Sequence, residues 1–418
     1  MTKKAEIITF GCRLNIYESE ILKQGVKEHD VKDTAIFNSC AVTAESVRQV
    51  KQSIRKRKRE FPDEKIIVTG CAAQIEPETF SNMNEVDLVS GNIEKRNILN
   101  IISGKKNTSK IEVQNIMENK QELNGLIDGY DNRSRAFIEI QNGCDHRCTF
   151  CIIPFGRGNS VSKSVKNIVQ EINLMIEKGH KEIVLTGVDI ASWGHDLNKK
   201  SNLGFLVRKI LEGSPSLTRL KLSSMDVIGF DQELLELIAT DSRILPHIHL
   251  SLQAGDNMIL KRMKRRHSRD DAINLCRNIR SSRPDIAFGA DLITGFPTET
   301  EEMFINTLNI VDECGLDWLH VFPFSPRPGT PAAKMPQNDK KISKERAKIL
   351  RDKGEKIKRS HLAGLIGKEI EVFIEKNNTG HTNQFAPVKL EENYEPGTSI
   401  IAYINQSDNN FVYGRLAH

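Results

Sequence analysis

Short apolar segments alternate with longer helix-compatible segments along most of the 418 residues. A first series of four ends near residue 92, and a second series of six lies between residues 136 and 324. Short buried strands that alternate with helices are typical of parallel sheets. The sequence therefore predicts an α/β protein, with an N-terminal parallel α/β domain followed by a central (β/α)6 partial barrel.

A polar stretch separates the two series, and a different pattern follows the second one. The strand candidates of the second series are 136–144, 182–188, 219–224, 247–253, 287–295 and 318–324, and one of the helices between them spans 256–281. Beyond a basic helix at 343–361, four short segments around a Gly/Asn-rich turn predict a small antiparallel β-barrel. We expect domains at 1–102, 135–362 and 363–418, with a linker at 103–134.

Three of the first four strand candidates are followed directly by a turn residue and a cysteine. They are IITFGC (7–12), TAIFNSC (34–40) and IIVTGC (66–71). The carboxyl ends of parallel strands lie along one edge of a sheet, where ligands bind. Cys12, Cys40 and Cys71 are therefore expected to meet at one metal site. The alternative is three separate buried thiols with a structural role.

Cys144, Cys148 and Cys151 form a C-x3-C-x2-C motif directly after the first strand of the second series. Three thiolates within eight residues suit a soft metal. A structural zinc site takes four ligands, and neither a fourth cysteine nor a well-spaced histidine pair lies nearby in the sequence. An iron–sulfur cluster with one open iron is therefore favoured over zinc or a ferredoxin-type cluster.

This motif in this position resembles the cysteine loop of the radical S-adenosylmethionine superfamily. Further segments extend the resemblance to the methylthiotransferase family over nearly the whole chain. They are ITFGCRLN (8–15), NSC (38–40), TGC (69–71), NGCDHRCTFCIIPFGRG (142–158), KEIVLTGVDIASWG (181–194), HIHLSLQAG (247–255), LITGFPTETEE (292–302) and FPFSPRPGTPAAKM (322–335). The C-terminal β segment resembles the TRAM domain, an RNA-binding barrel.

The resemblance implies two [4Fe–4S] clusters and S-adenosylmethionine as cofactors. Cys144, Cys148 and Cys151 would hold the cluster that cleaves S-adenosylmethionine to a radical, a hard step of the kind that cofactors supply. The cysteines at 12, 40 and 71 would hold an auxiliary cluster that presents the inserted sulfur. A second S-adenosylmethionine would donate the methyl group. The implied activity is methylthiolation at C2 of a modified adenosine next to the tRNA anticodon.

Gly-Cys-Arg-Leu-Asn at 11–15 resembles the branch of the family that acts on N6-threonylcarbamoyladenosine. The carboxylate of that substrate can pair with a guanidinium, which makes Arg13 a candidate reader of the modification. Arg13 can equally cap the strand turn or support the cluster. Two substrates of the same chemistry remain as alternatives, isopentenyladenosine in tRNA and a ribosomal-protein aspartate. A noncatalytic iron–sulfur RNA-binding protein is the alternative of another class.

The superfamily's pattern also implies individual site residues on the barrel. Those expected to contact S-adenosylmethionine, besides the cysteines, are Glu182, Ser223, Gln253 and Asp291. The candidates for contact with the substrate are Arg13, Asn15, Phe155, Trp193, Arg265 and Arg266. An aromatic side chain near the barrel mouth can stack on an RNA base. Packing in the core is the alternative role of the two aromatics.

Basic residues are clustered, although 60 Lys and Arg against 55 Asp and Glu give a net charge of only +5. Residues 51–59 and 261–269 each hold six bases and no acid, and the helix at 343–361 is also basic. Such clusters favour a polyanionic partner such as RNA or DNA, and the family resemblance implies that this partner is the tRNA anticodon stem-loop. Solvated helix faces are the alternative. The TRAM-like segment is net acidic, which argues against strong phosphate binding there.

No apolar run is long enough to span a bilayer, and the N-terminus shows no signal-peptide core. We therefore expect a cytoplasmic monomer with no membrane contact. The implied chemistry requires an external electron donor and a sulfur donor as further partners.

Overall fold

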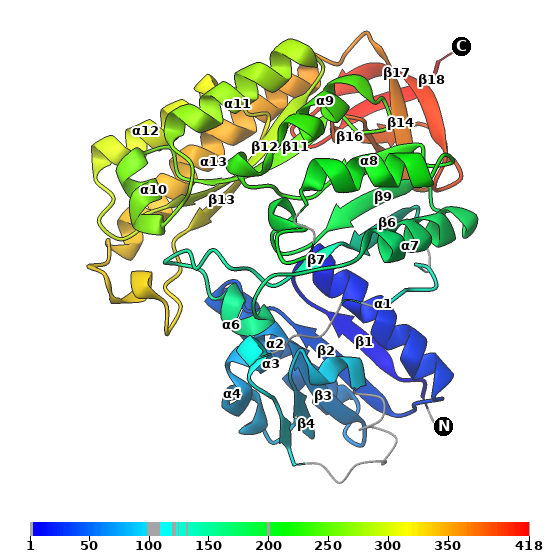
Figure 1. The fold of residues 1–418 in the computed structure, drawn as a ribbon, viewed down its shortest axis with the longest axis vertical. Coiled ribbons are helices and arrows are strands. Elements are labelled where there is room, and N and C mark those ends of the chain that lie inside the picture. The colour runs from blue at the N-terminus through cyan, green and yellow to red at the C-terminus, as the bar shows by residue number, and fades with distance from the viewer. Residues whose placement is uncertain are drawn as a thin grey trace.

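Three regions follow one another along the chain in Figure 1: an N-terminal sheet, a central partial barrel and a small C-terminal barrel. The computed structural model describes residues 3–97, 109–118, 123, 125–130, 133–198 and 201–417. None of the helices in these ranges is long and apolar enough to cross a membrane. The expected mixed α/β architecture with parallel sheets and a C-terminal barrel is confirmed.

The N-terminal sheet is parallel, with strand order β1-β2-β3-β4-β5. Its strands are β1 (Glu6–Thr9), β2 (Thr34–Ser39), β3 (Lys65–Gly70), β4 (Leu88–Ser90) and β5 (Ile111–Glu112). The helices between them are α1 (Arg13–Glu28), α2 (Ala44–Glu60), α3 (Cys71–Ile75) and α4 (Pro77–Ser81). Every residue of β2 is buried, because α1 packs on one face of the sheet and α2 on the other.

The described part of the predicted linker packs against both of the regions that it joins. Strand β5 pairs with β4 and completes the N-terminal sheet. A 3-10 turn at Ile116–Glu118 follows, and Ile116 is buried. Ile127 and Tyr130 belong to the core of the central barrel. Sequence analysis missed these contacts because residues 103–134 are mostly polar. A two-residue strand is also too short to show an alternating pattern of apolar residues.

The central barrel consists of two three-stranded parallel sheets, β10-β9-β6 and β11-β12-β13. Bridges at Leu220–Ile244 and Met225–Leu250 join the two sheets between β10 and β11. The strands are β6 (Arg135–Glu139), β9 (Glu182–Thr186), β10 (Arg219–Leu222), β11 (His247–Gln253), β12 (Ala287–Thr294) and β13 (Trp318–Pro323). Strands β6 and β13 are the outer strands, so this is the open six-stranded barrel that the sequence predicted.

Helices cover the outside of the barrel. They are α7 (Val165–Glu177), α8 (Leu203–Gly213), α9 (Gln232–Thr240), α10 (Asn257–Met263), α11 (Arg269–Ser282) and α12 (Glu301–Glu313). The single helix predicted at 256–281 is wrong, because Lys264 adopts a left-handed conformation with φ of 61° and ends α10. Ser268 then starts α11 with a capping box to Asp271.

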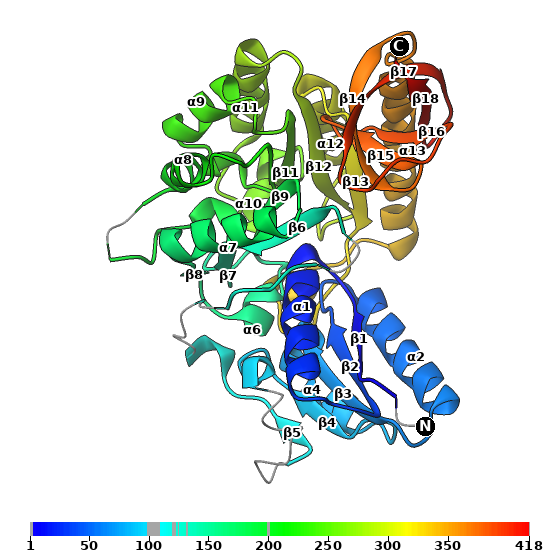
Figure 2. The same cartoon turned by 90° about the vertical axis from the view of Figure 1, so that its right-hand side faces the viewer.

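Helix α1 belongs to the N-terminal sheet by sequence but also packs against the barrel. Its residues Leu14 and Tyr17 lie in one continuous core with β6, β9 and α7. The Tyr17 hydroxyl donates to Glu171 on α7 at 2.9 Å, and Lys163 pairs with the same carboxylate at 2.6 Å. Figure 2 shows the N-terminal end of α1 at the barrel. The first two regions therefore share a core rather than meeting at a hinge.

Helix α13 (Lys340–Ala363) leads into the closed C-terminal barrel of strand order β14-β15-β16-β18-β17. The strands are β14 (Glu369–Lys376), β15 (Thr379–Thr382), β16 (Pro387–Leu390), β17 (Ser399–Ser407) and β18 (Val412–Leu416). The segment expected to be a Gly/Asn-rich turn forms β15, and β16 pairs with β18 in parallel, so the expected all-antiparallel arrangement of four strands is wrong in these two points. The barrel lies beside β13 and α13 (Figure 2).

Candidate functional site

Cys12, Cys40 and Cys71 lie at the carboxyl ends of three neighbouring parallel strands. Cys12 precedes α1, Cys40 follows β2, and Cys71 begins α3 after β3. Gly11 has φ of +97°, and a Cβ there would lie only 2.8 Å from the Cβ of Cys40. The absence of a side chain at Gly11 therefore allows the loops of Cys12 and Cys40 to meet.

The three thiols are close enough to affect one another. Burial raises the pKa of the Cys40 thiol, and the thiols of Cys71 and Cys12 raise it further. Burial also raises the pKa of Cys71, which the guanidinium of Arg157 opposes. Cys40 and Cys71 are buried, whereas Cys12 is exposed. This donor set fits a soft, positively charged metal centre that is reached from the side of Cys12.

Asn15 holds this site together. Its side-chain amide donates to the carbonyl oxygens of Phe10 at 2.7 Å and Ser39 at 3.1 Å. It thereby ties the chain before Cys12 to the chain before Cys40. Its carbonyl oxygen accepts from Arg157 at 2.5 Å. Both ends of the buried side chain are thus engaged within the protein, which gives Asn15 a structural role, and its contact with the substrate stays a prediction.

The second set of cysteines lies in the loop after β6 and β7 (Gln141–Asn142). Two N–H groups point at its sulfurs: the backbone of His146 at 3.5 Å from Cys144 Sγ and Arg265 Nη1 at 3.6 Å from Cys148 Sγ. Burial raises the pKa of Cys144 to about 12 and of Cys151 to about 11. Half-buried thiols with N–H donors suit metal-bound thiolates, because a cation and hydrogen bonds stabilise the charged form. The loop thus fits an iron–sulfur cluster.

His146 is engaged with neighbours around this loop. Its Nε2 lies 2.6 Å from Asp189 Oδ2 and 2.5 Å from Arg266 Nη2. Ser192 also donates to the same carboxylate oxygen at 2.6 Å. Cys144, His146 and Asp189 form one of the two described groups compact enough to hold a single metal ion. The pairing of His146 with Asp189 and Arg266 explains that compactness without a metal.

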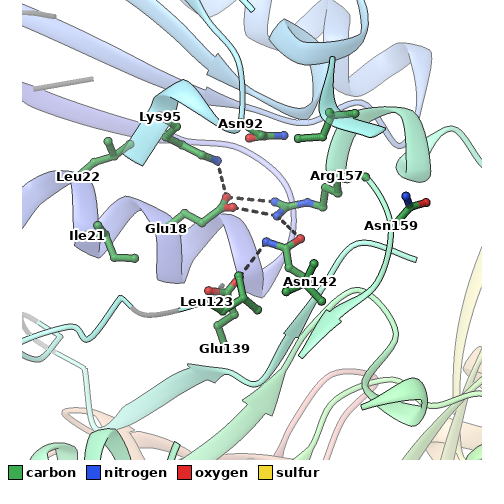
Figure 3. Close-up of a pocket in the computed structure, with 13 residues that line it drawn as sticks. Glu18, Ile21, Leu22, Asn92, Lys95, Leu123, Glu139, Asn142, Arg157 and Asn159 are labelled. Atoms are coloured by element: carbon green, nitrogen blue, oxygen red, sulfur yellow. Dashed lines mark hydrogen bonds and ion pairs between the residues drawn. The ribbon is translucent and has the colours of Figure 1, made fainter. Parts of the chain in front are cut away.

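Arg157 joins the two sets of cysteines. It ends the short helix α6 (Ile153–Arg157), which directly follows Cys151. Its guanidinium donates to Asn15, to Glu18 on α1 at 2.9 Å and to Asn142 beside the cysteine loop at 3.2 Å. Figure 3 shows Arg157 between Glu18 of the N-terminal region and Asn142 of the barrel. Sequence analysis missed this role, although Arg157 stands in the quoted segment 142–158.

Glu18 completes this junction. It accepts from Arg157 and, at 2.7 Å, from Lys95. Burial alone would raise the pKa of Glu18, but the two cations lower it to about 2. Asn92 adds a 2.5 Å hydrogen bond to the carbonyl of Gly156 on α6. Buried, mutually satisfied charges fix the orientation of the cysteine loop relative to the N-terminal sheet.

The residues predicted to contact S-adenosylmethionine lie at different depths in the barrel. Ser223 follows the last residue of β10, and Gln253 is the last residue of β11, so both lie at the barrel end that carries Cys144. Asp291 lies deeper, where it accepts from His249 at 3.0 Å and His320 at 3.3 Å. This His–Asp–His trio on adjacent strands is a feature that sequence analysis did not single out.

Glu182 lies at the opposite end of the barrel, as the first residue of β9. It pairs with Arg135 at 2.7 Å, Arg219 at 3.2 Å and His381 of the C-terminal barrel at 3.2 Å. Although burial opposes ionisation, His381 and the two arginines lower the pKa of Glu182 to about 2. The assignment of Glu182 to cofactor contact is therefore corrected, because its carboxylate connects the two barrels.

The two aromatic candidates have different surroundings. Trp193 is fully buried, and its indole N–H donates to the Lys163 carbonyl at 2.9 Å. Its assignment to substrate stacking is corrected to core packing. Phe155 lies on α6 with 45% of its surface exposed. Phe155 thus remains available to a base beside the cysteine loop.

Only part of the basic cluster 261–269 is open to solvent, since Lys261, Lys264 and Arg266 are exposed and the other bases are half-buried. Arg265 pairs with Asp226 at 3.1 Å in addition to its contact with Cys148, and Arg266 contacts His146. Arg262 and Arg269 donate to backbone carbonyls. Arg265 and Arg266 thus lie beside the cysteine loop, and their contact with the substrate stays a prediction. The break at Lys264 places Arg265 against this loop, which a count of charges cannot reveal.

Arg13 is the first residue of α1, and its side chain lies near the barrel interior. Burial and then Arg135 lower its pKa, while Glu182, Cys12 and Asp291 oppose this change. It makes no hydrogen bond or ion pair with the residues that the structure describes. The Arg13 side chain is therefore within electrostatic range of both Cys12 and acids of the barrel, and its contact with a substrate stays a prediction.

Two family models match the chain. The Radical SAM superfamily matches residues 138–311, and the Uncharacterized protein family UPF0004 matches residues 4–91. Among solved structures, a radical S-adenosylmethionine methyltransferase from Kitasatospora setae aligns with a TM-score of 0.57 at 14% identity, over 79% of this chain and 77% of that chain. This likeness supports the fold.

Curated relatives cover nearly the whole chain. A threonylcarbamoyladenosine tRNA methylthiotransferase MtaB from Rickettsia prowazekii is 49% identical over 93% of this chain and 92% of its own length. A protein of the same name from Bacillus subtilis is 32% identical, over 92% and 88%. A tRNA-2-methylthio-N(6)-dimethylallyladenosine synthase from Erythrobacter litoralis is 30% identical, over 90% and 87%. The chain therefore belongs to the radical S-adenosylmethionine methylthiotransferase family.

Proposed function

We propose that this protein is the tRNA methylthiotransferase that converts N6-threonylcarbamoyladenosine next to the anticodon into its 2-methylthio derivative. The observation that carries the proposal is the convergence of two cysteine sets on either side of Arg157, in a chain 49% identical to a relative named for this activity. Two sites that face one junction suit a reaction that both activates a C–H bond and delivers sulfur.

The radical S-adenosylmethionine superfamily implies one [4Fe–4S] cluster and S-adenosylmethionine in the central barrel. When bound, they supply a carbon-centred radical able to abstract hydrogen from an unactivated C–H bond. Cys144, Cys148 and Cys151 would hold the cluster, and Ser223 and Gln253, which lie at the same barrel end, would contact S-adenosylmethionine.

Cys12, Cys40 and Cys71 would hold a second [4Fe–4S] cluster that presents sulfur. Asn15 sets the distance between the two loops, and Arg157 holds this site against the cysteine loop. The exposure of Cys12 leaves an approach for substrate. An external electron donor and a sulfur donor complete the proposed set of partners.

The C-terminal barrel would contribute to tRNA binding as a TRAM-like module. Its position beside β13 and α13 extends the molecule away from the cysteine loop (Figure 2). Lys261, Lys264 and Arg266 are the exposed bases of the cluster 261–269 and would face the tRNA backbone. Phe155 is the exposed aromatic at the same place.

The test uses anaerobically reconstituted, reduced protein and three substrates: tRNA bearing threonylcarbamoyladenosine, tRNA bearing isopentenyladenosine, and a ribosomal protein. We expect nucleoside mass spectrometry to detect the 2-methylthio group only in the first. Methylthiolation of either other substrate would overturn the substrate assignment. A protein that forms no 5′-deoxyadenosine on reduction would instead be a noncatalytic RNA-binding protein.

A further inference from the structure

The inner face of strand β13 is open to solvent. Leu319 and Val321 pack into the core beneath the helices. Because side chains alternate along a strand, His320 and Phe322 point to the barrel interior, where Nδ1 of His320 lies 3.3 Å from Asp291. The His320 side chain is nevertheless 63% exposed, and Phe322 is 43% exposed. A closed barrel fills its interior with side chains, so this exposure reflects the place of β13 as an outer strand.

Phe322 lies at the barrel end that carries the cysteine loop. It pairs in register with Ile293 of β12, and Phe324 follows two residues later. Ile293 and Phe324 share a hydrophobic cluster with Phe150 of the cysteine loop. An exposed aromatic ring therefore stands close to the proposed site of hydrogen abstraction. Such a ring is suited to stack on an unpaired RNA base.

Two lysines lie alongside the outer edge of the same strand. Arg351 of α13 donates to the Val321 carbonyl oxygen at 2.9 Å, so this flank of α13 faces β13 (Figure 2). Lys344 and Lys348 stand seven and three residues before Arg351, which places them within about 60° of it around the helix. Both are exposed, and neither forms an ion pair or a side-chain hydrogen bond within the described ranges.

The lysines lie at the same end of the barrel as Phe322. The hydroxyl of Thr294, the last residue of β12, donates to the carbonyl oxygen of Ser343 at 3.2 Å. Lys344 follows Ser343 directly, and Lys348 lies one helical turn further, at about 6 Å along the axis. The positive charge is thus next to the strand ends at which the cysteine loop lies.

The exposed acids of α13 do not neutralise this flank. Glu345 and Asp352 are turned by about 100° or more from Arg351 around the helix. Glu355 pairs with Lys358 at 2.7 Å. The flank therefore combines cations without partners and a solvent-open aromatic ring, which is the pattern of surfaces that bind single-stranded nucleic acid.

We propose that Phe322 stacks on the base of the target adenosine while Lys344 and Lys348 bind phosphates of the flanking nucleotides, so that the anticodon loop enters the barrel across β13; this inference rests on the proposed function. The C-terminal barrel lies beside the same strand, where Trp318 donates to the Gln384 carbonyl at 3.1 Å. An RNA that crosses β13 therefore also reaches the TRAM-like module.

The adenine of S-adenosylmethionine is the other base that could stack on Phe322. Two placements favour RNA. Ser223 and Gln253, the proposed cofactor contacts, are at the ends of the central strands β10 and β11, whereas Phe322 is on the outer strand. S-adenosylmethionine also carries no phosphate, so it gives Lys344 and Lys348 no partner.

The experiment measures binding of a fluorescein-labelled anticodon stem-loop with threonylcarbamoyladenosine to the holoprotein, by anisotropy over a range of KCl concentrations. Phe322→Leu should lose roughly 5- to 150-fold in affinity, as for one base stack, with an unchanged salt dependence. Phe322→Tyr should bind as tightly as wild type. The double variant Lys344→Gln and Lys348→Gln should lower the slope of log affinity against log salt by about 1.4, as for two phosphates of a single strand.

Matched controls come from the outer helices. Phe205 on α8 is 37% exposed, and Phe205→Leu removes a comparable ring far from β13. Lys178 pairs with Asp128, and Lys209 pairs with Glu212. The double variant Lys178→Gln and Lys209→Gln removes the same net charge as the α13 double variant. Both controls should keep the wild-type affinity and salt slope.

A stem-loop with an abasic nucleotide at the target position isolates the stack. Wild type should bind it about as weakly as Phe322→Leu binds the complete stem-loop, and Phe322→Leu should lose nothing further. An equal abasic penalty in wild type and Phe322→Leu would show that Phe322 does not contact the target base. An unchanged salt slope in the α13 double variant would remove the phosphates from α13.

Reductive cleavage of S-adenosylmethionine without tRNA tests the cofactor alternative. Its KM should be the same in Phe322→Leu and wild type. A raised KM together with wild-type affinity for the stem-loop would assign Phe322 to the cofactor and overturn the inference.

The inference and the proposed function can fail separately. If wild type methylthiolates an isopentenyladenosine stem-loop instead, the substrate assignment falls, and the same variants measured on that stem-loop still decide the inference. If wild type binds the complete and abasic stem-loops equally yet methylthiolates threonylcarbamoyladenosine, only the inference falls.

Discussion

Cys144, Cys148 and Cys151 lie in one loop of eight residues, whereas Cys12, Cys40 and Cys71 come from three strand ends that are 28 and 31 residues apart. The geometry of the first set depends on local backbone. The geometry of the second depends on sheet register, in which Thr9 pairs with Asn38 and Asn38 pairs with Thr69. A one-residue slip would redirect every side chain of a strand. A set of metal ligands can therefore come from neighbouring residues of one loop, or from distant residues that the order of strands in a sheet brings together.

The two sets also differ in how they tolerate disturbance. The loop is supported by side chains around its own barrel mouth, such as Arg265. The N-terminal set depends on Gly11, on Asn15 and, across the region boundary, on Arg157. We therefore expect changes to these supports to affect the N-terminal set selectively.

The largest effect is expected from removing either set of thiols. Reconstituted wild type should hold about eight irons, as two [4Fe–4S] clusters do. Alanine at Cys144, Cys148 and Cys151 should abolish formation of 5′-deoxyadenosine and remove half of the iron. Alanine at Cys12, Cys40 and Cys71 should also halve the iron yet leave that cleavage active. Full iron content in either triple variant would show that its cysteines bind no cluster.

Arg157→Met should cost about 3 to 5 kcal/mol of stability, because it leaves Glu18 buried with one cation fewer. Denaturant unfolding measures this loss. Arg157→Met combined with Glu18→Gln should recover part of it, since the unpaired carboxylate is gone. The exposed pair Arg48 and Glu45 provides the control, and Arg48→Met should change stability by less than about 1 kcal/mol. Equal losses of stability in Arg157→Met and Arg48→Met would show that the buried contacts of Arg157 do not stabilise the protein.

Asn15→Leu should cost about 2 to 4 kcal/mol, because the carbonyl groups of Phe10 and Ser39 lose their buried donor. The iron bound by the N-terminal set should fall, while 5′-deoxyadenosine formation continues. Iron analysis combined with denaturant unfolding provides the measurement. Unchanged iron and stability together with a raised KM for tRNA would support Asn15 as a substrate contact.

The smallest effect is expected from Gly11→Ala compared with Gly329→Ala. Both glycines have positive φ, at +97° and +87°, but a Cβ has no neighbour within 4 Å at Gly329. The two variants share the backbone strain, so their difference isolates the contact with Cys40. We expect Gly11→Ala to be less stable by about 1 to 3 kcal/mol, as for overpacking. Equal losses would mean that the two loops can move apart freely.

The sequence was sufficient for the parallel architecture and for the placement of both cysteine sets, because strand ends are marked by an apolar run followed by a turn. It was insufficient for predicting the end of the barrel at which a residue lies and the direction in which its side chain points. Glu182 begins its strand and Ser223 follows its strand, so the two lie at opposite barrel ends although both occur in family-like segments. Arg265 stands in a run of bases but faces Cys148. Such side-chain directions depend on packing between distant segments.

Short elements were also beyond sequence analysis. Strand β5 has two residues, and β15 carries the residues Thr379–Thr382 within a stretch rich in Gly and Asn. In both cases pairing with a neighbouring strand overrides weak local preference. Arg157 was missed for a related reason, because its partners Asn15 and Glu18 are about 140 residues away along the chain.

The shared core of α1 has a consequence for protein engineering. Leu14 and Tyr17 are encoded with the N-terminal sheet but pack against the barrel, where Tyr17 meets Glu171. A chimaera that exchanges residues 1–102 between two relatives would therefore have to exchange the facing side chains of α7 with them. The units that can be recombined in this protein are therefore set by the interface on α1 and not by the order of the motifs along the chain.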